Sequence, residues 1–338
     1  MSGRYPDRSL PTRRAWLLGA GAIAIGAASH AAAAVTAGSV RVGVLPYGSA
    51  RWEIDVIRRH GFDIAEGVAA EPVELASDQA SDTAILGGSL DIVVSDWLWV
   101  SRQRAAGADL TTIPYSAAVG ALMVAAASDI ADIGGLRGRK LGVAGGPLDK
   151  SWLLLQALAG SRHGTDLTKD ASVSYGAAPL LTEKLRQGEL DAVLDYWQFA
   201  ARLEAEGYRR LIGVEDIIAA LGVPTRVPQL VYTFSERWAN ERPALALGFA
   251  RASARAKAVM RDDDDEWDRL RPLMGNPDDR AFELMRRRFR EGIVPAWGPA
   301  EQAAAETLYG ILASAGGEAL VGSSTRLSPG TFWASRGD

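Results

Sequence analysis

The segment GSLDIVVSDWLW, residues 88–99, returns 100 residues later as GELDAVLDYWQF, residues 188–199. Glycine, leucine, aspartate and tryptophan occupy the same places in both copies, without a gap. RVGV at residues 41–44 recurs in the same way as KLGV at 140–143, and each copy is followed by a tryptophan, Trp52 and Trp152. The chain therefore contains a duplicated unit.

Each unit alternates short β-branched segments with longer amphipathic ones, which predicts strands alternating with helices. The expected strands lie near residues 40–45, 73–75 and 91–94, and then near 140–144, 172–174 and 192–194. The expected helices lie near 50–59 and 79–86, and then near 150–159 and 180–186. Such alternation predicts an α/β fold with two lobes, each a mainly parallel sheet flanked by helices, and a cleft between them.

The C-terminal third has a different pattern. One more strand is expected within residues 227–238, followed by helices at 243–260 and 279–290 and by a helix from about 299 to 316. This tail has no sheet of its own, so its apolar helix faces need another surface to cover. We expect it to return to the first lobe, which gives lobe 1 as residues 38–120 plus 227–338 and lobe 2 as residues 121–226.

The N-terminus has the pattern of an export signal. A basic stretch ends in the pair Arg13 and Arg14, an uncharged segment follows, and small residues fill positions 31–37. This pattern resembles a twin-arginine signal peptide. We expect residues 1–37 to be that signal, cleaved near Ala34 or Ala37, and the mature protein to be periplasmic.

Composition excludes several classes of function. The 338 residues carry a net charge of -4 and no cysteine. An acidic chain without a basic tail argues against a nucleic-acid partner, and the lack of cysteine excludes disulfides, thiolate catalysis and a lipid-modified cysteine. The sequence contains no G-x-S-x-G, H-E-x-x-H or P-loop motif. We therefore predict no catalytic residue, no metal and no cofactor.

Three phrases carry a resemblance to a known family. They are VRVGVLPYGSARW at 40–52, LGGSLDIVVSD at 86–96 and IADIGGLRGRKLGVAGG at 130–146. With them the chain resembles the type II periplasmic solute-binding proteins of the nitrate, sulfonate, taurine and thiamine-precursor transport group. The resemblance implies a monomer that delivers a small-molecule ligand to an ABC transporter permease in the inner membrane. It also implies hinge segments near residues 116–121 and 226–230.

Candidate ligand-binding residues follow from the architecture, because open parallel sheets bind ligands at the carboxyl ends of their strands. Helix starts there could hold an anion, whereas acids beside aromatic rings suggest an ammonium or a flat heterocycle. The alternatives are that the tryptophans are core residues and that Asp78 and Asp149 are helix caps. The candidates are Tyr47, Gly48, Ser49, Trp52, Asp78, Asp96, Trp97, Gly146, Asp149, Trp152, Tyr175, Asp195, Tyr196 and Trp197.

The sequence thus predicts the substrate-binding component of an ABC-type importer, which captures a sulfonate, an amine or a pyrimidine-like solute without changing it. Two alternatives stay open. One is an exported accessory or sensor protein that uses the same cleft. The other is an enzyme like the thiamine-pyrimidine synthase of the same fold, which the absence of cysteine disfavours, because that family carries a cysteine-rich motif.

The export signal can be tested directly. We expect the double substitution Arg13→Lys, Arg14→Lys to leave precursor in the cytoplasm, because the twin-arginine pathway recognises the arginine pair. Fractionation and immunoblotting would measure this. Normal export and processing of the double variant would contradict the twin-arginine assignment.

Overall fold

The first of two sheets is built from both ends of the chain. The computed structural model describes residues 1–2, 37–46 and 48–334, so nearly all of the predicted signal peptide lies outside the described residues. β1 (Gly38–Val44) pairs in parallel with β2 (Val68–Glu74), and β3 (Val93–Ser95), β10 (Leu230–Phe234) and β4 (Thr111–Ser116) follow in the order β3-β10-β4. A parallel bridge from Val42 to Ile92 joins the two groups.

The second sheet repeats this arrangement strand for strand. Its order is β7-β6-β8-β5-β9, with β6 (Lys140–Ala144) parallel to β7 (Ser172–Gly176) and β8 (Ala192–Tyr196). β5 (Gly120–Val124) is antiparallel to β8 and to β9 (Arg209–Gly213), just as β10 is antiparallel to β3 and β4. The predicted fold class, two α/β lobes with mainly parallel sheets, is confirmed, and each sheet gains one antiparallel strand.

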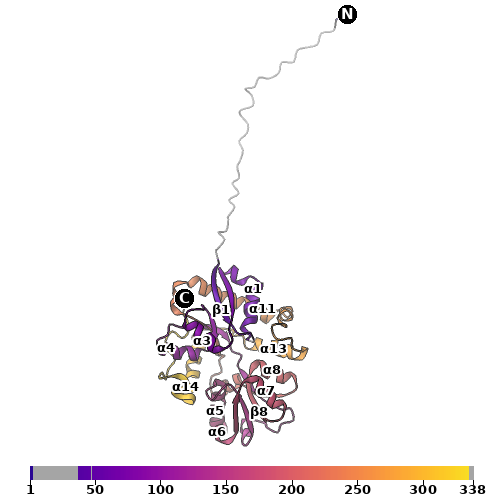
Figure 1. Cartoon of the computed structure of the whole chain (residues 1–338), viewed down its shortest axis with the longest axis vertical. Coiled ribbons are helices and arrows are strands. Elements are labelled where there is room, and N and C mark those ends of the chain that lie inside the picture. The colour runs from indigo at the N-terminus through magenta and orange to yellow at the C-terminus, as the bar shows by residue number, and fades with distance from the viewer. Residues whose placement is uncertain (3–36, 47, 335–338) are drawn as a thin grey trace. The chain divides into compact units, whose positions relative to one another are not determined.

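Helices cover these sheets, and several begin and end where the sequence pattern predicts. α1 (Ala50–Arg59) has the predicted bounds, and α3 (Asp78–Leu86) starts one residue earlier than predicted. Figure 1 shows α1 and α11 beside β1, and α5, α6 and α7 grouped around β8. The other helices are α2 (Phe62–Ala65), α4 (Trp97–Ala105), the short 3-10 turn Ile133–Leu136, α5 (Lys150–His163), α6 (Leu167–Asp170), α7 (Ala178–Arg186), α8 (Trp197–Ala205), α9 (Val214–Ala220), α10 (Glu236–Glu241), α11 (Pro243–Asp262), α12 (Asp265–Leu270), α13 (Asp279–Glu291) and α14 (Pro299–Val321).

One aspartate in each half ties the first strand to the third. The Asp91 carboxylate accepts hydrogen bonds from the backbone N–H of Arg41 at 2.8 Å and from its Nε at 3.0 Å. In the second half, Asp191 accepts the backbone N–H of Lys140 at 2.7 Å. Both aspartates therefore help to fix strand pairing.

The helical tail contacts both halves. α11 packs against α1 and β2, whereas α13 packs against α8 and α14 packs against α5 and α4. The reason is apolar complementarity: Phe289 of α13 meets Trp197, and Leu308 of α14 joins the core around Trp152. α14 also continues past Gly316, with a break at Gly317 (φ 58°), where the helix was expected to end. The lobe boundaries stay a prediction.

Because Asp91 accepts hydrogen bonds from Arg41, removing its side chain should destabilise the protein. Asp91→Ala should lower the free energy of unfolding by about 1 to 3 kcal/mol, because it leaves a partly buried backbone N–H and a guanidinium without their acceptor. Urea unfolding would measure this. The matched control is Asp129→Ala, which breaks an ion pair to Arg139 at a side chain that is 74% exposed and should cost about 1 kcal/mol or less. Equal losses for the two variants would contradict the structural role of Asp91.

Candidate functional site

A cavity of about 380 Å³ opens where the carboxyl ends of strands from both sheets meet. Its walls come from the loop after β1 and the start of α1, the start of α3, the end of β3 and the starts of α5 and α8. Both connections between the sheets complete it, through Ala118 and Val119 on one and Gln229 and Leu230 on the other. Segments from both halves of the duplication therefore surround one space.

Three of the helices that start at this cavity, α3, α4 and α5, have a side-chain cap, whereas α1 and α8 have none. Asp96 precedes α4 and accepts the backbone N–H of Trp99 at 2.9 Å, and Asp149 precedes α5 and accepts that of Trp152 at 3.1 Å. At α3 the cap is Ser77, whose hydroxyl accepts the N–H of Ala80 at 3.2 Å, so Asp78 is the first helical residue. Capping satisfies N–H groups that could otherwise hold an anion.

Carboxylates dominate the charge of the cavity. The lining includes Asp78, Asp82, Asp96 and Asp149, and Lys150 is its one cationic side chain among the described residues. The Lys150 ammonium lies 3.4 Å from an Asp96 oxygen. Burial, and then the nearby charges of Asp96 and Asp78, raise the pKa of Asp82 to about 6. Burial also raises the pKa of Asp78, with the charge of Asp96 adding to it.

A buried polar network stands behind one wall. The Ser49 hydroxyl, which lines the cavity, lies 2.9 Å from the Tyr115 hydroxyl. Next to it, the fully buried carboxylate of Glu53 accepts hydrogen bonds from Tyr232 at 2.9 Å and from Lys257 at 2.8 Å. Burial lowers the pKa of Lys257, and the charge of Glu53 opposes that shift. These paired charges anchor α1 to α11 and to the strand beneath them.

The predicted site residues separate into distinct groups. Tyr47 lies outside the described residues. The residues that line the cavity are Gly48, Ser49, Asp78, Asp96, Asp149, Tyr196 and Trp197. The residues that do not line it are Trp52, Trp97, Gly146, Trp152, Tyr175 and Asp195.

Three of the tryptophans that follow strands are core residues rather than cavity residues. Trp97 is fully buried, and its indole N–H donates to the Pro228 carbonyl at 2.7 Å. Trp52 donates to the Leu273 carbonyl at 3.2 Å and packs edge-on against Trp197. Trp152 is 1% exposed. Their indoles hold helices against the sheets, which is the alternative that the sequence left open.

Asp195 does not line the cavity. Asp96 aligns with Tyr196 in the 100-residue repeat, so Asp195 aligns with Ser95. Ser95 does line the cavity, so strand position alone does not decide which side chains reach it. Asp195 is 3% exposed and its carboxylate lies 2.6 Å from the Thr182 hydroxyl.

Several residues of the cavity lining were not among the predicted site residues. Asp82 lies one helical turn after Asp78 on α3, and Lys150 directly follows Asp149, so both could have been found from helix periodicity and adjacency. Gln229 had no such signal, because it lies in an irregular connection.

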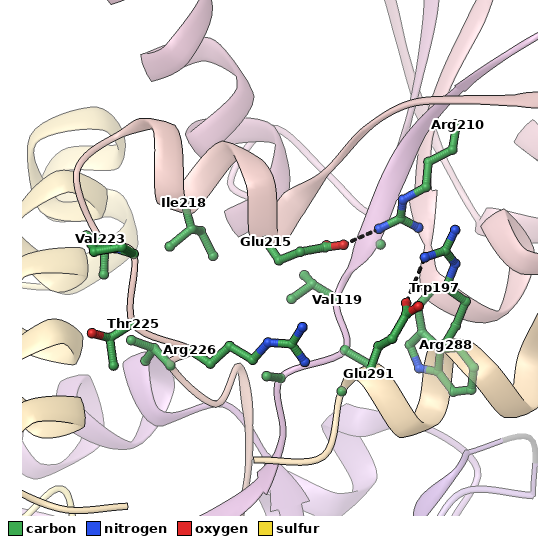
Figure 2. Close-up of a pocket in the computed structure, with 16 residues that line it drawn as sticks. Val119, Trp197, Arg210, Glu215, Ile218, Val223, Thr225, Arg226, Arg288 and Glu291 are labelled. Atoms are coloured by element: carbon green, nitrogen blue, oxygen red, sulfur yellow. Dashed lines mark hydrogen bonds and ion pairs between the residues drawn. The ribbon is translucent and has the colours of Figure 1, made fainter. Parts of the chain in front are cut away.

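A second, smaller cavity of about 60 Å³ lies beside the same connections (Figure 2). Arg210 is paired there with Glu215 at 2.5 Å, and Arg288 with Glu291 at 2.7 Å. Figure 2 shows the Arg226 side chain extending between the two glutamates. The space is too small for an organic solute and its charges are largely paired, so the larger cavity is the candidate binding site.

Other kinds of site find no support in the part of the chain that the structure describes. Within those residues, no group of three or more histidine, aspartate or glutamate side chains is arranged to hold a metal ion. None of the helices described has the length and apolar character needed to cross a membrane.

Two lobes with a cavity at the strand ends define the class, a two-lobed protein of the periplasmic-binding-protein type. A family model described as NMT1/THI5 like matches residues 56–267, and the chain belongs to that family. No curated protein sequence matches the chain.

Solved structures share the fold at low identity. The periplasmic aliphatic sulphonate binding protein SsuA from Escherichia coli is 19% identical, with 88% of this chain and 92% of that chain covered and a TM-score of 0.70. The alkanesulfonate-binding protein SsuA from Xanthomonas axonopodis pv. citri bound to MOPS is 16% identical, with 87% and 98% covered and a TM-score of 0.65. The desulfurization enzyme DSZB is 16% identical, with 82% and 92% covered and a TM-score of 0.55. The fold alone therefore does not decide between binding and catalysis.

The buried carboxyl group of Asp195 should make the free energy of unfolding depend on pH. Burial raises the pKa of Asp195 to about 6, with hydrogen bonds from Thr182 and the Tyr196 N–H opposing the shift. The Thr182 hydroxyl also lies 2.8 Å from the Ala178 carbonyl, so a protonated Asp195 can donate to Thr182 while Thr182 donates to Ala178. The folded protein thus favours the protonated form, and the stability this group contributes is present below pH 4 and lost as pH rises through about 6.

Asp195→Asn should therefore raise the free energy of unfolding at pH 8 by about 1 to 3 kcal/mol, because the amide mimics the protonated acid. Urea unfolding at pH 8 and at pH 4.5 would measure the gain and its decrease in acid. A variant less stable than the parent at pH 8 would contradict the assignment.

Proposed function

We propose that the protein is the substrate-binding component of an ABC-type importer and acts outside the cytoplasmic membrane. The observation that carries the proposal is the cavity of about 380 Å³ lined by both halves of the duplication and by both connections between the sheets. Its size falls in the range of small-molecule sites, about 300 to 1,000 Å³. The solute belongs to one of three classes, a sulfonate, an amine or a pyrimidine-like compound.

Capture is reversible and uses the two connections as a hinge. Residues 117–119 join β4 to β5, and residues 221–229 join α9 to β10. The connections are themselves hydrogen-bonded at their ends, where the N–H of Gln229 donates to the Ser116 carbonyl at 2.8 Å. Rotation about so few residues would bring the cavity walls together around a ligand. The closed form is the one that a membrane permease would recognise.

The chemistry of the lining favours binding over catalysis. Ser49 faces Tyr115 rather than a base, and no histidine is among the described residues that line the cavity. One observation supports the enzyme alternative, namely the fold that the chain shares with DSZB. The accessory or sensor alternative differs only in lacking a permease partner.

Native mass spectrometry of protein purified from its own host should show a retained small molecule. The mass of that molecule should stay the same when it is incubated with the protein. Small-angle scattering with that compound at saturation should show a smaller radius of gyration than the ligand-free protein. The melting temperature should also rise, since a ligand at about 100 times its dissociation constant adds about 2.7 kcal/mol.

Conversion of the retained compound on incubation would replace the binding function by an enzymatic one. An unchanged radius would contradict hinge closure. Deletion of this gene and deletion of permease genes can be compared for uptake of the compound. Uptake that needs this gene but none of the permeases would favour the accessory or sensor alternative.

A further inference from the structure

Gln229 lines the cavity and carries a buried hydrogen-bond acceptor without a partner among the residues described. The residue is 2% exposed, and the atom without a partner is its side-chain Oε1. Its Nε2 donates to the Val227 carbonyl at 3.1 Å. That bond fixes the orientation of the amide, because the reverse orientation would place two oxygens against each other. The buried atom is therefore an acceptor, and a ligand that approaches it must bring a donor.

The charges around the cavity also favour a ligand that brings hydrogen-bond donors. Asp78, Asp82, Asp96 and Asp149 face it, against one ammonium, that of Lys150. Lys150 is already engaged, at 3.4 Å from Asp96 and 3.4 Å from the Gln229 carbonyl. An anionic solute would meet an excess of like charge in a partly dehydrated space, whereas a cation would relieve it.

The starts of α4 and α5 offer an anion little compensation, whereas those of α1 and α8 carry no side-chain cap. The caps of α4 and α5 are carboxylates, Asp96 and Asp149, which already accept N–H groups at those ends. A sulfonate directed at these two helices would have to displace a side chain of its own charge sign. An aromatic side chain of the lining such as Trp99 can pack against a cationic ligand.

From this arrangement we infer that the cavity selects a solute with a cationic nitrogen that carries N–H donors, an ammonium or a guanidinium. Gln229 and Asp82 are two of its recognition residues. The inference rests on the proposed binding function and narrows its three solute classes to one.

The test compares two sets of compounds of similar size by calorimetry and thermal shift on the mature protein. Agmatine and cadaverine are the cationic probes, and butanesulfonate and pentanesulfonate are the anionic ones. We expect a cationic probe to bind and the sulfonates to leave the melting temperature unchanged. In parallel, protein incubated with host extract is analysed by native mass spectrometry for the charge class of any captured compound.

Two variants locate the binding. Asp82→Asn and Gln229→Leu should each weaken binding of the cationic ligand about tenfold or more, because each removes an acceptor from a partly dehydrated contact. Asp268→Asn, an exposed acid on α12 outside the cavity, is the matched control and should change affinity less than about twofold. Asp82→Asn removes a carboxylate that repels its neighbours, so it should fold even where Gln229→Leu does not.

The outcomes separate the inference from the proposed function. Binding of a sulfonate, or capture of an anion, would overturn the inference and leave the binding function standing. Cation binding that is insensitive to Asp82→Asn would also overturn the assigned recognition. If neither the probes nor the extract yields a bound compound, the proposed function fails together with the inference.

Discussion

The fold depends on a carboxylate that holds the first strand of each half beside the third. Asp91 and Asp191 each accept the backbone N–H at the equivalent position of the first strand. A charged acceptor makes this bond stronger than an ordinary backbone pair. With the pairing fixed, the carboxyl ends of the strands lie together, and the loops that follow them converge on one space. The site exists because this contact occurs twice.

The scaffold and its ligand chemistry are separable. The NMT1/THI5-like fold is shared with SsuA proteins whose names describe sulfonate binding and with an enzyme, DSZB, all at identities below 20%. Among the described residues that line the cavity of this chain, four aspartates face a single lysine. Burial, and then the charges of Asp96 and Asp78, raise the pKa of Asp82 to about 6. The cationic ligand that we infer would be selected by these local charges and not by the fold.

The segments that join the sheets serve two purposes. β5 and β10 each insert antiparallel between strands of the opposite direction, so the chain crosses between the halves twice. Gln229 lies on the second crossing, which places a residue of the cavity lining on the segment about which the halves would rotate. α13 and α14 add apolar contacts to α8 and α5. A ligand bound at Gln229 would act directly on the hinge.

The sequence by itself determined the duplication, the α/β class and most element positions. Each of these is encoded by a local period or by a repeated motif. Only the tertiary structure decided which side chains reach the cavity. Trp97 and Trp152 are core residues and Asp195 faces Thr182, although the sequence placed all three at a promising strand end. Gln229 became a site residue through a connection with no periodic pattern. The physical reason is that the direction of a side chain depends on packing between segments far apart in the chain, which no local pattern records.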